Sequence, residues 1–287
     1  DTDRSRGLGD VYKRQVYWMA FQILMGNVDT QNRNVYLYSP LNSDIWYFIA
    51  WDNDGCLMRP EYELRNFSDQ NSWEKGISNY WGNILFQRCL KSRSFREKLN
   101  DAILDLREYL NKDMLTSKIE SYKNVLKPYL YLMPDAEYEP LTSEQYDQIA
   151  ASLPDEIEKN YQLYLESLET PMPFYIGVPT IDGDKLKFNW DVSYDLDAED
   201  ITYSVEVAGD YLFRDVIYQN TTLTVPEAEM DLPKAGQYFV RVRATNTSGK
   251  TQDAFDYYVT DEGKYYGMRC FYITEDSTVE EDDYEEG

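Results

Sequence analysis

Residues 27–55 read NVDTQNRNVYLYSPLNSDIWYFIAWDNDG and carry the most informative pattern in the chain. Two runs rich in aromatic and β-branched residues, 35–38 and 45–51, flank the segment SPLNSD at 39–44. Strands favour such aromatic and branched residues, whereas Pro, Asn and Ser favour turns. The sequence therefore predicts a β-hairpin at this place.

The polar residues at the ends of this hairpin form the candidate site. In an antiparallel pair, the residue before the first strand and the residue after the second lie at the same open end. We therefore expect Asn34 and Asp52 to approach each other, with Asp29 and Asp54 close by. Three carboxylates in one place raise each other's pKa and need a neutralising partner. A hard divalent cation with oxygen ligands, Mg²⁺ or Ca²⁺, would supply it.

The spacing of the first two candidates narrows the chemistry. Asp29 and Asn34 are separated as in the D-x-x-x-x-N segment of a protein-kinase catalytic loop, where the Asp orients the attacking hydroxyl and the Asn binds a metal ion. A hairpin then leads to a second metal-binding Asp, the role that Asp52 would fill. The motif pair alone is a weak signal, and the hairpin and its WDND ending give it weight.

Other interpretations of these residues stay open. Asp29 and Asn34 are also typical turn residues, and DNDG at 52–55 is also typical of a tight turn or a structural cation site. An EF-hand loop is excluded, because its sixth position requires Gly and, counted from Asp52, that position is Leu57.

A family resemblance rests on the same residues. The run GNVDTQNRNVYLY at 26–38, a short turn and WYFIAWDND at 46–54 resemble the core motif of the CotH (spore coat protein H) kinase family. The resemblance covers residues 16–170, the C-terminal part of a kinase-like domain. One departure is Ala50, where family members commonly have Pro before the Trp-Asp pair.

The resemblance implies a role for each candidate. Asp29 would be catalytic, Asn34 and Asp52 would bind the ATP cofactor, and Asn34, Asp52 and Asp54 would be the Mg²⁺ ligands. Members are atypical secreted kinases of bacterial spore coats and cell surfaces, which implies phosphate transfer from ATP to a hydroxyl of a coat or surface protein. The competing interpretation is a non-catalytic surface scaffold, or a carbohydrate- or protein-binding protein with a structural cation site.

Residues 1–15, DTDRSRGLGDVYKRQ, differ in character from the rest of the chain. We expect them to be a non-native N-terminal artefact, with the natural sequence beginning near Val16. The Gly-rich loop and phosphate-pairing Lys of a kinase are not recognisable in the chain, so both are expected upstream, as is a signal peptide. An extracellular or cell-surface location is thus an expectation from the resemblance.

The composition excludes several partners and mechanisms. The 287 residues include 28 basic and 52 acidic ones, and a net charge of −24 disfavours nucleic acids and anionic membranes as partners. The nearest basic residues to the hairpin for binding phosphate are Arg33 and Arg59. The chain has no His, which excludes Ser-His-Asp mechanisms and His-ligated zinc. Its three Cys, at 56, 89 and 270, are expected to be isolated thiols.

Residues 16–170 are predicted to be mostly helical around the hairpin. A buried helix at 16–25, too short to span a bilayer, ends at Gly26. A long loop is predicted at 59–82. Further helices are predicted at 83–110, with Asn83 as N-cap, and at 115–126, before Pro128. A last helix is predicted to begin at a capping box of Thr142 and Gln145, to be interrupted at Pro154 and to resume over 155–168.

The pattern changes after Thr170-Pro171-Met172-Pro173, which is typical of an exposed linker. Beyond it, Trp190 and Tyr238 resemble the core Trp and the tyrosine corner of a fibronectin type III domain, predicted over 173–262. Residues 263–287 are predicted to be an aromatic segment and a disordered acidic tail. The strands of the sandwich are predicted at 185–191, 201–207, 222–225, 237–245 and 254–259.

The predicted fold class is α+β. A mostly helical lower half of an atypical kinase-like fold, with a catalytic β-hairpin, precedes an all-β fibronectin type III-like sandwich. The expected partners are a protein substrate or a glycan bound by the sandwich, with no nucleic acid and no membrane span.

Overall fold

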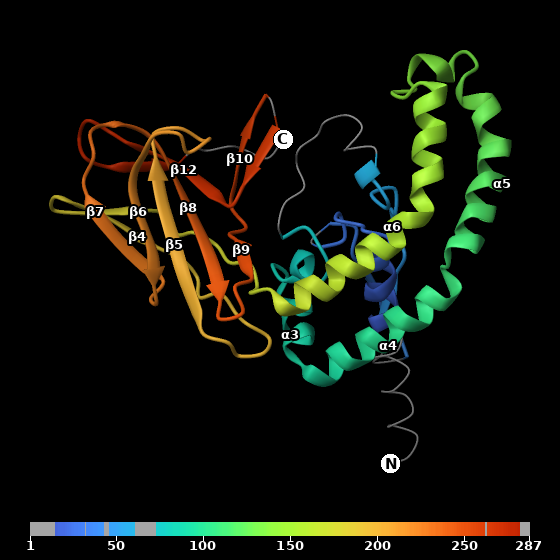
Figure 1. Ribbon diagram of the computed structural model, residues 1–287, viewed down its shortest axis with the longest axis horizontal. Helices are drawn as coiled ribbons and strands as arrows, with labels where there is room; N and C mark the ends of the chain where they lie inside the picture. The colour runs from blue at the N-terminus through green and yellow to red at the C-terminus, as the bar shows by residue number, and fades with distance from the viewer. Residues whose placement is uncertain (1–14, 32, 43–45, 61–72, 262, 282–287) are drawn as a thin grey trace. The chain divides into compact units, whose positions relative to one another are not determined.

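The computed structural model describes residues 15–31, 33–42, 46–60, 73–261 and 263–281 (Figure 1). Two compact units make up the chain. The first comprises Asp1–Asn66 and Lys75–Leu165, and the second comprises Phe67–Glu74 and Glu166–Gly287. Helices dominate the first unit and antiparallel sheets the second, which confirms the predicted α+β class.

The first unit opens, within the described ranges, on a helix over residues 15–24. Its apolar side chains are buried, among them Met19 and Leu24, as its sequence predicts. The helix ends in a left-handed Gly26 (φ 60°). The Gly26 N–H bonds to the carbonyl of Ile23 (3.1 Å), and the Asn27 N–H bonds to that of Gln22 (3.0 Å). This Schellman closure directs the chain into the segment that carries Asp29.

A second group of helices follows the hairpin in the first unit. Asn83 caps the first of them as predicted, because its side-chain oxygen accepts from the Leu85 N–H at 3.0 Å. The single helix predicted over 83–110 is wrong. The extended backbone of Ser92 (φ −79°, ψ 116°) divides it into two. The elements are η1 (Ser78–Tyr80), α3 (Ile84–Lys91), α4 (Arg93–Tyr109), α5 (Lys112–Leu130), η2 (Asp135–Glu137) and α6 (Ser143–Glu169).

Two prolines lie inside helices that were predicted to stop at them. Helix α5 contains Pro128 and α6 contains Pro154. Proline removes one backbone hydrogen bond and bends a helix, but surrounding turns can carry the helix past it. Figure 1 shows the two halves of α6 running in different directions. The predicted capping box is confirmed by reciprocal bonds between Thr142 and Gln145, at 2.9 and 3.2 Å.

The predicted hairpin is confirmed. Strand β1 (Tyr36–Tyr38) pairs antiparallel with β2 (Tyr47–Ile49), with Leu37 opposite Phe48. Both strands are shorter than predicted, and residues 43–45, which include the start of the predicted second strand, lie outside the described residues. Because side chains alternate along a strand, Leu37 and Phe48 point to one face of the hairpin. Tyr36, Tyr38 and Ile49 belong to the other face and are exposed.

The second unit contains two larger antiparallel sheets over one core. Apolar side chains of both sheets, such as Phe188 and Val242, belong to the same buried cluster as Trp190. The six-stranded sheet has the order β13-β12-β8-β5-β6 with β9 also on β8; the other sheets are β3-β4-β7 and β10-β11. The strands are β3 (Thr180–Asp182), β4 (Lys185–Asn189), β5 (Ile201–Ala208), β6 (Val216–Leu223), β7 (Glu227–Asp231), β8 (Gly236–Asn246), β9 (Thr251–Asp253), β10 (Tyr257–Thr260), β11 (Gly263–Tyr266), β12 (Met268–Ile273) and β13 (Val279–Glu281).

Three predictions about this unit are corrected. Residues 170–173 are buried instead of forming an exposed linker, because the Met172 N–H bonds to the Tyr194 carbonyl (2.8 Å) at the edge of the core. The strand predicted at 222–225 is only the end of β6. The acidic tail is ordered as far as β13, which pairs with β12, and residues 282–287 lie outside the described residues.

A segment from between the hairpin and α3 also belongs to the second unit. Trp73 is 5% exposed, and its ring lies against Phe255 (centroids 5.2 Å) and Tyr266 (5.9 Å). The Tyr266 hydroxyl bonds to the carboxylate of Glu74 at 3.2 Å. The β10–β11 pair that carries Tyr266 therefore holds a segment that the sequence pattern assigned to a loop of the kinase-like region.

None of the helices in the described ranges is long and apolar enough to cross a membrane. All three cysteines lie in these ranges, and none forms a disulfide, in agreement with the sequence-based expectation of isolated thiols.

Replacing Trp73 by Ala should destabilise the β-rich unit by about 3–5 kcal/mol, because a buried aromatic side chain would leave a cavity. Hydrogen exchange at the amides of residues 257–260 should accelerate. Trp51→Ala is the matched control, since Trp51 is 55% exposed and its loss should change the unfolding free energy by less than about 0.5 kcal/mol. Equal protection of 257–260 in the two variants would contradict the assignment of Trp73 to this core.

Candidate functional site

The hairpin's open end is marked by unusual backbone geometry. Asn34 (φ 57°) and Asp52 (φ 48°) both adopt left-handed conformations, which are uncommon outside Gly. Each lies just beyond the last paired residues, Tyr36 and Ile49. Backbone strain of this kind concentrates at functional sites and at turns, and Asn and Asp tolerate it best. The predicted candidates thus occupy the two positions where the chain departs from the strands.

Electrostatic interactions connect Asp52 with the other two aspartates. The negative charge of Asp54 raises the pKa of Asp52, with further contributions from desolvation, a hydrogen bond with Asp54 and the charge of Asp29. All three aspartates are exposed, and Asn34 is half-buried. Asp54 and Asp29 therefore both lie within electrostatic range of Asp52. Asn34 shares their end of the hairpin.

The donor set fits a magnesium ion better than a calcium ion. Within the described ranges, no three or more His, Cys, Asp or Glu side chains are arranged to hold a metal ion. Ca²⁺ takes six to eight oxygen ligands, whereas Mg²⁺ is usually held by one or two carboxylates together with phosphates and water. Asp52 and Asp54 would offer two carboxylates, and Asn34 would offer an amide oxygen.

A buried amide cluster joins the two acidic segments. The Gln22 side chain donates to the side-chain oxygen of Asn53 at 2.9 Å, and the Asn27 side chain donates to that of Gln22 at 3.0 Å. A longer contact of 3.4 Å joins Asn27 to Asn53. Gln22 and Asn27 are almost completely buried. We call these three residues the amide cluster; they connect the helix before Asp29 to the residue between Asp52 and Asp54.

The amide cluster also holds the backbone of Asp29. The Asp29 N–H donates to the side-chain oxygen of Asn27 at 3.1 Å. The next residue, Thr30, is buried and bonds to the Tyr80 hydroxyl at 3.0 Å and to the Asn27 carbonyl at 3.3 Å. Burial raises the pKa of Tyr80 well above its ordinary value, so this phenol stays protonated and able to donate. The loop that carries Asp29 is therefore held by hydrogen bonds to Asn27 and Tyr80.

Gly55 permits the close approach of the two segments. A Cβ atom at this position would lie 2.9 Å from the Asp29 carboxylate and 3.0 Å from the Asn27 side-chain oxygen, closer than ordinary packing allows. Burial raises the pKa of the neighbouring Cys56 thiol to about 12, which disfavours the reactive thiolate form.

Sequence patterns assigned no role to Gln22, Asn53 or Tyr80. Gln22 is the one amide in the apolar run VYWMAFQILM, and a polar residue on a buried helix was the signal that could have identified it. Asn53 was visible only as part of WDND. Nothing in the local sequence of Tyr80 connects it with Thr30, which lies 50 residues earlier.

Arg59 is not available to bind phosphate. Its guanidinium pairs with the buried carboxylate of Glu156 at 3.0 Å and donates to the Asn160 side chain at 2.8 Å. The other basic residue predicted to lie near the hairpin, Arg33, is exposed.

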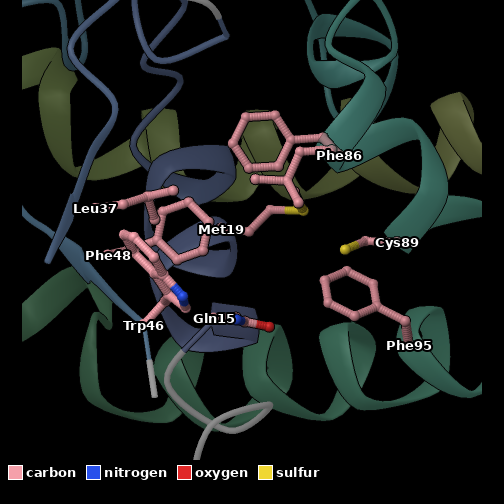
Figure 2. Close-up of a pocket in the computed structure, with 9 residues that line it drawn as sticks. Gln15, Met19, Leu37, Trp46, Phe48, Phe86, Cys89 and Phe95 are labelled. Atoms are coloured by element: carbon pink, nitrogen blue, oxygen red, sulfur yellow. The ribbon is translucent and has the colours of Figure 1, made fainter. Parts of the chain in front are cut away.

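The face of the hairpin that carries Leu37 and Phe48 lines an apolar cavity (Figure 2). Leu37 and Phe48 line it from the two strands, and Figure 2 shows Met19 between them and Cys89. Its volume is about 300 Å³, and no charged side chain lines it. The cavity therefore belongs to the packing side of the hairpin. The lining residues are Gln15, Met19, Leu37, Trp46, Phe48, Leu85, Phe86, Cys89 and Phe95.

Comparisons with known proteins identify a family. A family model described as CotH kinase protein matches residues 12–164, beginning inside the segment 1–15 that we predict to be non-native. No curated protein matches the chain.

Two solved structures show weak similarity. One is the twitchin kinase region from C. elegans (Fn31-NL-kin-CRD-Ig26), with 15% identity, a TM-score of 0.25, and coverage of 33% of this chain and 20% of that chain. The other is surface layer protein SbsC, domains 1–6, with 14% identity, a TM-score of 0.18, and coverage of 96% and 38%. This chain spans less than half the length of either, and scores this low do not bear on the fold.

Replacing Asp54 by Asn should stabilise the metal-free protein at neutral pH. The raised pKa of Asp52 means that the folded state binds its proton more tightly than the unfolded state does. Its contribution to stability is thus fully present below the ordinary value of 3.8 and is lost as pH rises through the raised value. The variant lacks the main source of repulsion, so its thermal midpoint at low salt should exceed that of the wild type at pH 7.

Differential scanning calorimetry from pH 3 to pH 7 would test this expectation. The difference between Asp54→Asn and the wild type should shrink as pH falls toward about 3.8, and Mg²⁺ should reduce it at pH 7. Asp276→Asn, at an exposed position of the β-rich unit, is the control. A lower midpoint for Asp54→Asn at pH 7 in the absence of metal would show that the carboxylates do not repel each other.

Proposed function

The chain belongs to the CotH kinase family, and from this premise we propose that its hairpin end transfers phosphate from ATP to a protein hydroxyl. The observation that carries the proposal is the close approach of the two acidic segments, in which the Asp29 carboxylate lies against Gly55 and buried hydrogen bonds hold both segments. Acidic groups kept together against their repulsion suit a cation-dependent reaction. An ordinary structural hairpin has no need of them.

The aspartates have two separate tasks in this proposal. Asp52 and Asp54, with the amide of Asn34, would hold Mg²⁺, which when bound neutralises and orients the phosphates of ATP. Asp29 is exposed and has no part in that task. Its carboxylate would accept the hydrogen of a Ser, Thr or Tyr hydroxyl and direct the oxygen toward the γ-phosphate. The bond from the Asp29 N–H to Asn27 fixes the loop that aims it.

Charge makes the proposed nucleotide binding dependent on the cation. A protein with a net charge of −24 repels a nucleoside triphosphate. Arg59, the nearest basic residue after the second motif, is engaged by Glu156. We therefore expect no measurable ATP binding without Mg²⁺, and an affinity that falls with ionic strength.

The β-rich unit supports a role outside the reaction itself. The Tyr238 hydroxyl donates to the Lys234 carbonyl at 2.9 Å, the bond of a tyrosine corner, and Trp190 lies in the shared core. These features support a fibronectin type III-like module that acts as a spacer or as an interaction surface. A coat or surface protein as substrate, and a location outside the cell, are implied by the family resemblance and are part of this proposal.

Two substitutions separate metal binding from hydroxyl activation. In the longest natural form of the protein, Asp52→Ala should abolish Mg²⁺-dependent ATP binding and phosphate transfer, because the metal loses a carboxylate ligand. Asp29→Asn should leave ATP binding intact and lower transfer by about two to four orders of magnitude, because an amide cannot accept the hydroxyl proton. Thermal-shift titration with MgATP and transfer from labelled ATP to surface-protein extracts would measure the two effects.

The wild type itself decides between the two interpretations. Stabilisation by MgATP together with transfer supports a kinase. If neither is seen and Ca²⁺ stabilises the protein in a manner lost with Asp52→Ala, the site is structural and the chain is a scaffold. Equal loss of ATP binding in Asp29→Asn and Asp52→Ala would contradict the division of tasks between them.

A further inference from the structure

A buried ion cluster on α6 lies outside the proposed site. The Glu156 side chain is 1% exposed, and its carboxylate pairs with Arg59 at 3.0 Å and with Lys159 at 2.6 Å. Removing a charge from water is costly, so a buried carboxylate persists where several charged hydrogen bonds compensate it. Arg59 follows the DNDG segment and lies 97 residues before Glu156 in the sequence. The cluster therefore connects α6 to the chain leaving the second acidic motif.

The same guanidinium reaches a second residue of α6. Arg59 donates to the side-chain oxygen of Asn160 at 2.8 Å, and Asn160 lies one turn after Glu156 on the same face of the helix. The amide group of Asn160 in turn donates to the carbonyl of Leu24 at 2.9 Å. Asn160 thus joins Arg59 to the C-terminal end of the first helix, from which the Asp29 loop departs.

Backbone geometry shows that the two chain segments meet at this cluster. The Leu57 N–H bonds to the carbonyl of Met25 at 2.8 Å. Leu57 (φ 57°) and Gly26 (φ 60°) both have left-handed backbones where the segments meet. A Cβ atom on Gly26 would lie 2.7 Å from the Asn160 amide, so Asn160 is seated directly on the turn.

We propose that Arg59, Glu156 and Asn160 are positioning residues that hold the Asp29 loop and the Asp52–Asp54 segment in one relative orientation from α6. The inference rests on the proposed function, since the orientation matters only where the two segments act together. None of the three residues is among those proposed to hold the metal ion or the reacting hydroxyl. Their effect passes through Leu24–Gly26 on one side and through Leu57–Arg59 on the other.

Arginine is required at position 59 by the geometry. Its guanidinium bonds to Glu156 through one terminal nitrogen and to Asn160 through the other. A lysine offers one ammonium group without the planar fork, so it would keep the ion pair with Glu156 and lose the simultaneous bond to Asn160. Arg59→Lys therefore separates the positioning role from the charge balance of the buried carboxylate.

The test compares Arg59→Lys with the wild type and with Asp155→Asn. Asp155 neighbours Glu156 on α6 but forms an exposed pair with Lys112, so its loss is the matched control. We expect Arg59→Lys to unfold cooperatively at a slightly lower temperature than the wild type, because the buried Asn160 oxygen loses its donor, while phosphate transfer and Mn²⁺ affinity each fall about tenfold or more. Hydrogen exchange at residues 27–29 and 53–55 should accelerate. Asp155→Asn should change none of these quantities.

Each outcome decides the inference separately from the proposed function. If the wild type transfers phosphate and Arg59→Lys leaves transfer, Mn²⁺ affinity and exchange unchanged, the positioning role is overturned and the kinase proposal stands. If the wild type transfers no phosphate, faster exchange at both segments, with exchange elsewhere in the first unit at the wild-type rate, still supports the positioning role. Unchanged exchange, or a loss of stability that accounts for all the changes, overturns it. Asn160→Asp, which can still accept from Arg59 but cannot donate to Leu24, should accelerate exchange at residues 27–29 in particular.

Discussion

The amide cluster is the interaction on which the rest of the candidate site depends. Gln22 comes from the first helix, Asn27 from the turn after it, and Asn53 from between the two hairpin-end aspartates. An unpaired amide buried at this depth would cost about 1–3 kcal/mol, so each member requires the others. The cluster therefore fixes the separation of segments that are adjacent in space only because the hairpin folds back.

Because the two acidic segments are held at a fixed separation, their aspartates cannot move apart to reduce their repulsion. Carboxylates on mobile loops would move apart and relieve their repulsion, whereas here the charges of Asp54 and Asp29 raise the pKa of Asp52. Gly55 removes the steric barrier to the approach, and the left-handed backbones of Asn34 and Asp52 turn the chain at both strand ends. The folded protein thus keeps three aspartates near one another, and a bound cation would reduce the repulsion between their charges. A reaction that uses such a cation would explain why the arrangement is kept.

Local patterns predicted the parts of the fold that local chemistry controls. The hairpin, the Asn83 cap, the Thr142–Gln145 capping box and the Gly26 helix end depend on residues close to one another in sequence. The errors arose where distant contacts overrule composition. Helix α6 continues through Pro154, and the Pro-rich segment 170–173 is buried by its bonds to residues 193 and 194. The amide cluster and the Arg59–Glu156 pair join residues far apart in sequence, so no spacing rule could have identified them, although Gln22 in an apolar helix was a visible anomaly.

The central claim is that the two hairpin-end segments share one cation, and the location of a bound paramagnetic ion tests it most directly. Mn²⁺ is added in substoichiometric amounts to ¹⁵N-labelled protein, and line broadening is measured for each backbone amide. The account predicts that residues 52–55 and Asp29 broaden first, that excess Mg²⁺ restores their signals, and that Asp52→Ala removes the effect. Broadening centred elsewhere, for example on the acidic loop at residues 195–200, with 52–55 unaffected, would contradict it.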